Sequence, residues 1–354
     1  MLWEYSRDSH IFIFSVGRGN AALVRTPLNQ GFIVDMGSSD EFSPVKVIKS
    51  TFLRKLSKYQ KCQIAQTVLS HAHADHIAEC EHLRDDLSPK LVTCPNNKDY
   101  PDGSPSREKL NWKRITNPEG TGDLVDAYKD LYSSRHLPLQ TIQTTGNSNA
   151  EYSLFYVRPP VCEKLHASDD NKYGNSTSLM FFYKHGLTSV LLPGDMTPEV
   201  MQHVLNQREG TETRHTKFDP KWMAQHPKSY CENSLDQPSL AGLLKANPLT
   251  ILVAPHHGLE SCYSPDLYSA MEGGKPELVV ISEKRKLSET DGKLAAAYQT
   301  EAGASGLEVT TDGKREARRS VSTIDGRHML IKMNGVSAPQ VFADKDIGRL
   351  VNCM

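Results

Sequence analysis

The feature that most constrains this chain is a run of three histidines and one aspartate within six residues, His71-Ala72-His73-Ala74-Asp75-His76. The apolar and β-branched residues 67–69 precede it and predict a buried strand, whereas residues 77–83 have the pattern of an amphipathic helix. The run therefore lies on a tight loop between a strand and a helix. Because imidazole nitrogens and carboxylate oxygens are ligands of zinc and similar ions, this loop predicts a metal site.

Two further predicted strands end in residues of the same chemical kind. Residues 189–192 run into Pro193-Gly194-Asp195, and residues 250–254 run into Pro255-His256-His257-Gly258. Either sequence alone would be read as a turn or a surface loop. Ligands in α/β proteins gather at strand ends, so beside the first loop we expect both segments to join the same site. A carboxylate at Asp195 would let two cations sit about 4 Å apart.

The first part of the chain predicts a β-meander, with short strands at residues 11–16, 21–26 and 32–35 separated by Gly and Pro turns. Asp35 ends the third of these strands, just before Met36-Gly37. An acidic residue at such a place commonly forms a turn. Beside a metal loop, we expect Asp35 to orient a metal ligand.

Length and charge bound the organisation of the chain. The 354 residues show no internal repeat and no low-complexity linker, so we expect one hydrolase domain over residues 1–335, with insertions near 95–150 and 198–247, and a polar tail over 336–354. The formal net charge of -1 gives no global basic field for nucleic acid. A local strip would suffice, and residues 284–286 and 314–319 offer two basic clusters that are either a phosphate path or solvated faces.

The seven cysteines are scattered, odd in number and without Cys-x-x-Cys spacing, which favours a reducing compartment over a disulfide framework. The first residues lack the pattern of a signal peptide, and no apolar run approaches the length of a membrane span. We therefore expect a cytoplasmic protein without a membrane partner.

His-x-His-x-Asp-His after a strand resembles the signature of the metallo-β-lactamase superfamily. The segment Ser15-Val16-Gly17-Arg18-Gly19-Asn20-Ala21-Ala22-Leu23 is similar to the Val-Gly-Gln-Gly-Asp-Ala signature of the ComEC family of DNA-uptake proteins. Residues 32–37, 158–160, 175–180, 192–195 and 255–258 follow in that family's order, so the resemblance runs from about Ile11 to about Met333. It implies an αββα sandwich of two mixed sheets flanked by helices, a di-metal site and cleavage of phosphodiester bonds in DNA.

Four departures from the family pattern matter. The family's membrane channel has no counterpart in this sequence, so transport is not implied. Asn20 stands where the family has Asp, and Glu283-Lys284-Arg285-Lys286 stands where it has a Gly- and Asn-rich loop with its own histidine. No histidine lies near Asn175, where many superfamily members supply a third ligand to the first metal.

The resemblance implies two divalent ions, zinc or alternatively manganese. One ion would be held by His71, His73 and Asp195, and the other by Asp75, His76, Asp195 and one histidine of the pair. His257 is favoured as that ligand. His256 is then expected either to face the substrate or to support a ligand from behind, and the reverse assignment of the two histidines stays open. Asn175 or Asp170 is a candidate to complete the coordination of the first ion with an oxygen ligand.

Roles in catalysis are assigned to Asp75, His256 and Asp35. Asn175, Ser178 and Lys284 are assigned to substrate binding, with fixing of the loop as the alternative for Asn175 and Ser178. We thus expect a metal-dependent phosphodiesterase or nuclease acting on DNA or another nucleic acid. The alternatives are a hydrolase of small cyclic nucleotides and an effector or regulatory subunit that is active only with a protein partner. A basic groove open at both ends would favour DNA, and a closed pocket a nucleotide.

Overall fold

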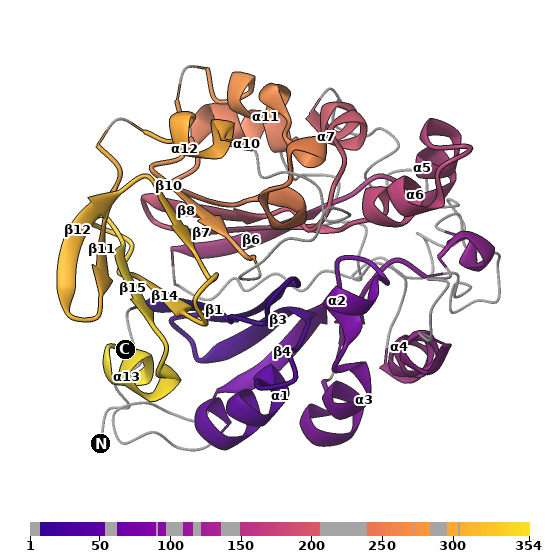
Figure 1. Cartoon of the computed structure of the whole chain (residues 1–354), viewed down its shortest axis with the longest axis horizontal. Coiled ribbons are helices and arrows are strands. Elements are labelled where there is room, and N and C mark those ends of the chain that lie inside the picture. The colour runs from indigo at the N-terminus through magenta and orange to yellow at the C-terminus, as the bar shows by residue number, and fades with distance from the viewer. Residues whose placement is uncertain are drawn as a thin grey trace.

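The computed structural model of the chain describes residues 8–53, 62–89, 91–96, 109–115, 122–135, 149–205, 239–272, 274–283, 296–303 and 305–354. In this part of the chain, two β-sheets pack face to face (Figure 1). The first sheet contains β1 (Ser9–Ile13), β2 (Ala21–Arg25), β3 (Gln30–Met36), β4 (Gln63–Val68), β5 (Val92–Thr93), β11 (Leu307–Thr311), β12 (Lys314–Arg318), β14 (His328–Met333) and β15 (Gln340–Asp344). The second contains β6 (Ala150–Phe155), β7 (Met180–His185), β8 (Thr188–Leu192), β9 (Ile251–Val253), β10 (Leu278–Ile281) and β13 (Ser320–Ser322).

The strand order is β12-β11-β15-β14-β1-β2-β3-β4-β5 in the first sheet and β13-β10-β9-β8-β7-β6 in the second. Both sheets are mixed. In the first, β3, β4 and β5 are parallel, whereas β1 is antiparallel to β2 and β14. In the second, β8, β9, β10 and β13 are parallel, whereas β6, β7 and β8 form an antiparallel meander.

Helices cover the outer faces of both sheets (Figure 1). Those on the first sheet are α1 (Pro44–Val47), η1 (Ile48–Phe52), α3 (Cys80–His82), η2 (Leu83–Leu87), α4 (Gly122–Arg135) and α13 (Ile347–Asn352). Those on the second are α5 (Pro159–Leu165), α6 (Asp170–Ser176), α7 (Pro198–Leu205), α10 (Leu240–Ala246), α11 (Pro265–Ser269) and α12 (Ala297–Thr300). The predicted αββα sandwich is confirmed. None of the helices in the described ranges has the length and apolar character needed to cross a bilayer.

Side-chain alternation in the strands explains the layering. In β1, Ile11 and Ile13 face the core between the sheets, whereas Phe12 faces the core beneath the helices. The strand is apolar on both faces for this reason. Across the inner core, the rings of Phe32 and Tyr152 join the two sheets at a centroid distance of 4.7 Å. Burial of one such side chain stabilises the fold by about 1.5–3 kcal/mol.

The parallel strands bring their carboxyl ends to one edge of the sandwich. β3 and β4 of the first sheet run into Asp35 and the histidine-rich loop, while β8 and β9 of the second run into Asp195 and His256. The short helix α2 (Ala74–Ile77) lies at this edge, between the two sheets (Figure 1). The three predicted ligand segments and Asp35 therefore share one edge of the molecule.

The expectation of a polar tail over residues 336–354 is wrong. β15 lies inside the first sheet, between β11 and β14, and α13 packs beside it. Val341 and Ala343 of β15 are buried, as are Leu350 and Met354 after it. Most of the charged and polar residues in this segment are exposed, so the segment is amphipathic rather than polar. The predicted insertions near 95–150 and 198–247 lie largely outside the described residues.

Candidate metal centre

Four predicted ligands come together at this edge: Asp75, His76, Asp195 and His257. One ligand atom from each lies within 4.8 Å of the others. Nε2 of His257 lies 3.2 Å from Oδ2 of Asp75 and 3.7 Å from Oδ2 of Asp195. Nε2 of His76 lies 3.1 Å from Oδ1 of Asp195. This is the set predicted for the second ion, with His257 rather than His256 supplying the histidine.

The set predicted for the first ion is more open. Nε2 of His71 lies 3.9 Å from Oδ2 of Asp195, and the rings of His71 and His73 lie 4.5 Å apart. The Nε2 edge of His73 packs against Gly174 on α6, where an added Cβ would lie only 2.3 Å from that nitrogen. Coordination by His73 would therefore use Nδ1. Only a glycine at 174 lets α6 approach the ring this closely.

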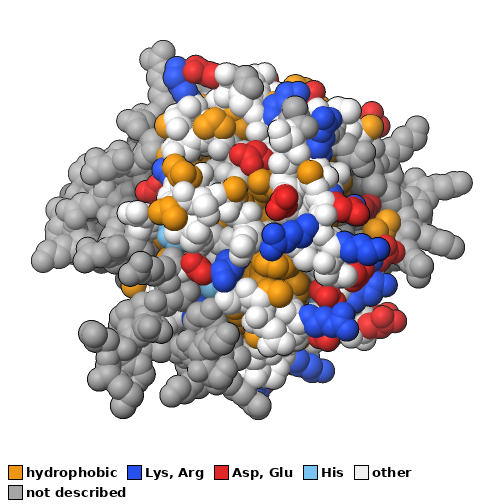
Figure 2. Space-filling view, turned by 90° about the vertical axis from the view of Figure 1, so that its left-hand side faces the viewer, with side chains coloured by type: hydrophobic (Ala, Val, Ile, Leu, Met, Phe, Trp, Pro, Cys, Tyr) orange, Lys and Arg blue, Asp and Glu red, His pale blue; other side chains and the backbone are white. Residues whose placement is uncertain are grey.

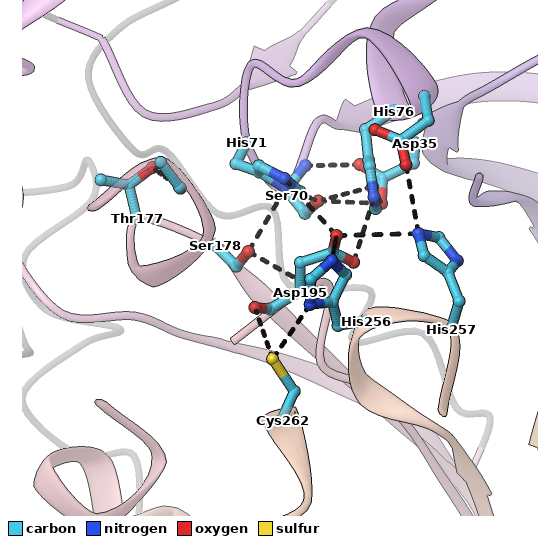
Figure 3. Close-up of polar contacts among 12 residues, drawn as sticks. Asp35, Ser70, His71, His76, Thr177, Ser178, Asp195, His256, His257 and Cys262 are labelled. Carbon is cyan, nitrogen blue, oxygen red and sulfur yellow. Dashed lines mark hydrogen bonds and ion pairs between the residues drawn. The ribbon is translucent and has the colours of Figure 1, made fainter. Parts of the chain in front are cut away.

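Asp35 and Ser70 fix the ring orientation of two histidines (Figure 3). Asp35 accepts hydrogen bonds from Ser70 N at 2.6 Å and Ser70 Oγ at 2.9 Å, and its Oδ2 lies 2.8 Å from Nδ1 of His76. Nδ1 of His71 lies 3.0 Å from the same Ser70 Oγ. Because the carboxylate accepts the serine proton, His71 donates from Nδ1 to Ser70 and His76 donates from Nδ1 to Asp35. Both Nε2 atoms then keep their lone pairs for the centre.

Several of the atoms that face the centre lack hydrogen-bond partners in the described part of the chain. Among the described residues, Nε2 of His71, Nε2 of His76 and both carboxylate oxygens of Asp195 are buried without a hydrogen bond. His76 Nε2 and Asp195 Oδ1 are close, but their geometry is not that of a hydrogen bond. Burying several such atoms without partners is costly. A divalent cation satisfies them together, so this donor set fits the predicted metals.

The His256–His257 pair has an unusual backbone. It lies in η4 (Pro255–Gly258), and both residues have left-handed backbone angles, with φ of 47° and 58°. Each such conformation costs a non-glycine residue about 1–3 kcal/mol and persists only where the surrounding structure holds it. The turn directs both rings to the centre, because Nε2 of His256 lies 3.6 Å from Oδ2 of Asp195. The sequence motif alone could not show that both histidines reach the site.

Cys262 is a site residue that the sequence analysis missed. It lies in η5 (Glu260–Cys262), and its Sγ is 3.1 Å from Nδ1 of His256 (Figure 3). Burial raises the pKa of its thiol to about 12, so the side chain stays a neutral thiol that contacts the histidine. A scattered cysteine without a motif gave no signal for this role.

The charged groups of the site strongly shift one another's pKa values. Burial lowers the pKa of His71, and the neighbouring His76 and His73 lower it further. Burial acts in the same direction on His76, but the carboxylates of Asp195, Asp35 and Asp75 outweigh it and hold the pKa of His76 well above its usual value. Binding of a cation would therefore displace a proton from Nε2 of His76, which frees the lone pair that faces the centre. Burial opposes ionisation of Asp195, yet the surrounding histidines keep its pKa well below the usual range. The site thus favours ionised carboxylates, which suits cation binding.

Two predicted substrate-binding residues lie behind the ligands. Ser178 is fully buried, accepts a hydrogen bond from Asp195 N at 3.1 Å and lies 3.3 Å from Nδ1 of His71. These contacts favour the alternative that it fixes the loop. Asn175 is 6% exposed, and its Oδ1 has no hydrogen-bond partner in the described ranges. Lys284 lies outside the described residues. Asp170 is not at the centre, because it is exposed and forms an ion pair with Arg114.

No protein-family model matches the chain, and no curated protein sequence is significantly similar to it. Among solved structures, the metallo-hydrolase Igni18 of Ignicoccus hospitalis is 11% identical, with a TM-score of 0.36 over 77% of this chain and 81% of that one. Human tRNase Z, short form, is 10% identical, with a TM-score of 0.36 over 81% and 96%. The diiron β-hydroxylase CmlA of Streptomyces venezuelae is 13% identical, with a TM-score of 0.33 over 75% and 49%.

Likenesses at this level carry no information about substrate. The two mixed sheets, the outer helices and the ligands at one edge nevertheless give the chain the metallo-β-lactamase-type fold that its motifs predict. Function has to be inferred from the residues at the centre.

Proposed function

We propose that this protein is a metal-dependent hydrolase that cleaves phosphodiester bonds, in DNA or another nucleic acid or in a smaller nucleotide. One observation carries the proposal. A buried group of imidazole and carboxylate ligands converges at the sheet edge, with several of its polar atoms lacking partners among the described residues. Buried polar atoms of a purely structural cluster normally all have hydrogen-bond partners, whereas a metal centre leaves ligand atoms free to face the ion.

The residues would divide between two ions, with zinc or manganese as the candidates. Asp75, His76 and His257 would hold one ion, His71 and His73 the other, and Asp195 would bridge them. When bound, such a pair of ions activates a water molecule as nucleophile and neutralises charge on a phosphodiester. Asp35 and Ser70 would keep the ligand rings in the tautomer that binds metal.

His256 is the imidazole best placed to exchange a proton with a substrate. Its side chain is 17% exposed, whereas those of His71 and His76 are fully buried. Cys262 contacts its Nδ1, so Nε2 is the atom directed at the centre. In this role, Nε2 of His256 would donate a proton to the leaving group.

A phosphodiester is favoured over other substrates chiefly by the ComEC-like motifs, since phosphodiester cleavage is what that resemblance implies. The basic cluster on β12 adds little. Figure 2 faces the side of the molecule that carries β12 and shows acidic and basic side chains interspersed. Arg318 forms an ion pair with Glu316 in that strand. This arrangement supports the interpretation of a solvated face for residues 314–318.

The test is a substrate panel on purified protein. Single-stranded DNA, double-stranded DNA, RNA and cyclic nucleotides are incubated with added zinc or manganese, with and without a chelator. Cleavage of a phosphodiester that is lost on chelation and restored by metal supports the proposal, and the preferred substrate separates a nuclease from a nucleotide hydrolase. Absence of cleavage throughout would contradict it and favour a regulatory subunit that needs a protein partner.

A further inference from the structure

The loop that joins β1 to β2 carries a basic residue, Arg18, beside two residues that contact the backbone of the predicted metal ligand Asp75. Its neighbour Gly19 lies against the backbone carbonyl of Asp75, where an added Cβ would be 2.6 Å from that oxygen. Asn20 N donates a hydrogen bond to the same carbonyl at 3.3 Å. On the other side, Ser282 Oγ donates to Gly19 O at 2.7 Å. The loop is therefore fixed to a predicted metal ligand and to the end of β10.

Arg18 is half-buried, between Gly17 and Gly19, whose backbone φ values of +74° and +152° only glycine adopts readily. This backbone holds Arg18 next to the segment that contacts the predicted ligand Asp75. The positive charge of Arg18 also acts on His256, the histidine expected to face the substrate. Burial lowers the pKa of His256, and the positive charges of His257 and Arg18 lower it further, against the carboxylates of Asp195 and Asp75.

A phosphodiester substrate needs such a cation. Asp35, Asp75 and Asp195 lie at the centre and would offset most of the charge that two divalent ions bring. A guanidinium close enough to act on His256 supplies a permanent positive charge, and its planar donors match two oxygens of a phosphate.

We propose that Arg18 binds a non-bridging oxygen of the substrate phosphate and so selects anionic over neutral substrates. This inference rests on the proposed function. The family motif that the loop resembles has a glutamine at this position, so the cation is a feature of this chain rather than of the motif.

The test compares two esters with the same leaving group, on Arg18→Gln, Arg18→Lys and wild-type protein loaded with zinc or manganese. Bis-para-nitrophenyl phosphate is an anionic diester, and diethyl para-nitrophenyl phosphate is a neutral triester. Removing a charge-assisted hydrogen bond typically costs a factor of about 10–100, so Arg18→Gln should lower kcat/KM by this factor on the diester and by less than about threefold on the triester. Arg18→Lys should keep part of the diester activity. Arg349→Gln on α13, with its side chain 70% exposed, is the matched control and should match wild type.

A second readout does not depend on turnover. Calorimetric titration with inorganic phosphate should show about tenfold weaker binding to metal-loaded Arg18→Gln than to wild type. Equal losses on both esters, or unchanged phosphate binding, would overturn the inference and assign Arg18 a structural role. If the wild-type protein cleaves neither ester, the proposed function fails for such substrates, and the phosphate titration alone decides whether Arg18 recognises the anion.

Discussion

Nδ1 of His76 lies 2.8 Å from Oδ2 of Asp35, and both side chains are fully buried. Asp35 comes from β3 and His76 from α2, so this contact fixes the histidine-rich loop to a strand on the neighbouring part of the sheet. It also determines which ring nitrogen of His76 faces the centre. The contact therefore links the stability of the loop to its capacity to bind metal.

We expect Asp35→Asn to weaken metal binding more than it weakens folding. The amide cannot accept both the His76 and the Ser70 protons as a carboxylate does, and loss of such a supporting partner typically lowers metal affinity about 10–100-fold. Competition with a fluorescent zinc chelator measures the change. Asp126→Asn, at an exposed position on α4, is the control. Equal zinc affinity in wild type and Asp35→Asn would show that Asp35 does not position the ligand.

The contact between Cys262 and His256 predicts a specific kinetic effect. Cys262→Val should lower kcat by about tenfold without reducing metal content, because His256 loses the group that holds its Nδ1. Cys262→Ser should be milder, since a hydroxyl can replace the thiol as a partner. The pH profile of kcat should shift in the valine variant. A valine variant with wild-type kcat and pH profile would contradict this role.

His328, which lies outside the metal centre, should make the free energy of unfolding depend on pH under acidic conditions. His328 accepts a hydrogen bond at Nδ1 from Ser15 N at 3.0 Å, and burial lowers its pKa to about 4, against the opposing charge of Asp344. Its pKa in the unfolded chain is about 6.5. Between these values only the unfolded state takes up the proton, so the free energy of unfolding should fall as pH drops from 6.5 towards 4, by about 2 kcal/mol at pH 5.

Urea unfolding of wild type and His328→Asn at pH 7 and pH 5 measures this contribution. Asn can accept the Ser15 hydrogen bond through its side-chain oxygen but does not titrate in this range. The variant should therefore lose less stability than wild type between the two pH values. Parallel losses in the two proteins would show that His328 is not responsible.

The two ions should differ in how firmly they are held. The second would have four protein ligands, and the first would have only His71, His73 and Asp195, which is the pattern of an open site. Asn175 follows Gly174, which packs against the His73 ring, and its Oδ1 has no partner among the described residues, so it is the candidate to complete the coordination of this ion. Metal analysis after gel filtration without added metal should give clearly fewer than two ions per chain, with activity restored by zinc or manganese. Two ions retained through brief chelation would contradict this difference.

The sequence predicted the sandwich and its site edge because both depend on local patterns. Runs of apolar residues such as Phe32–Val34 indicate a buried strand by their composition alone. The ligand motifs directly follow the ends of such strands. β15 was missed because the strand is only five residues long and has three apolar residues, Val341 to Ala343, between polar ends. Cys262 was missed because its role depends on a turn that brings η5 against His256, a tertiary contact that no spacing rule encodes. Ser178 was partly misread for the same reason, since only the packing shows that it lies behind His71.

The most direct test of the metal centre is the activity of Asp195→Ala on a phosphodiester substrate cleaved by the wild-type protein. Both proposed ions share this carboxylate, so the substitution should lower kcat/KM by at least about a hundredfold in a protein that remains folded. Asp126→Ala, which removes an exposed carboxylate on α4, should leave kcat/KM unchanged. If Asp195→Ala is folded, as judged by circular dichroism, and retains wild-type activity, the di-metal mechanism is wrong.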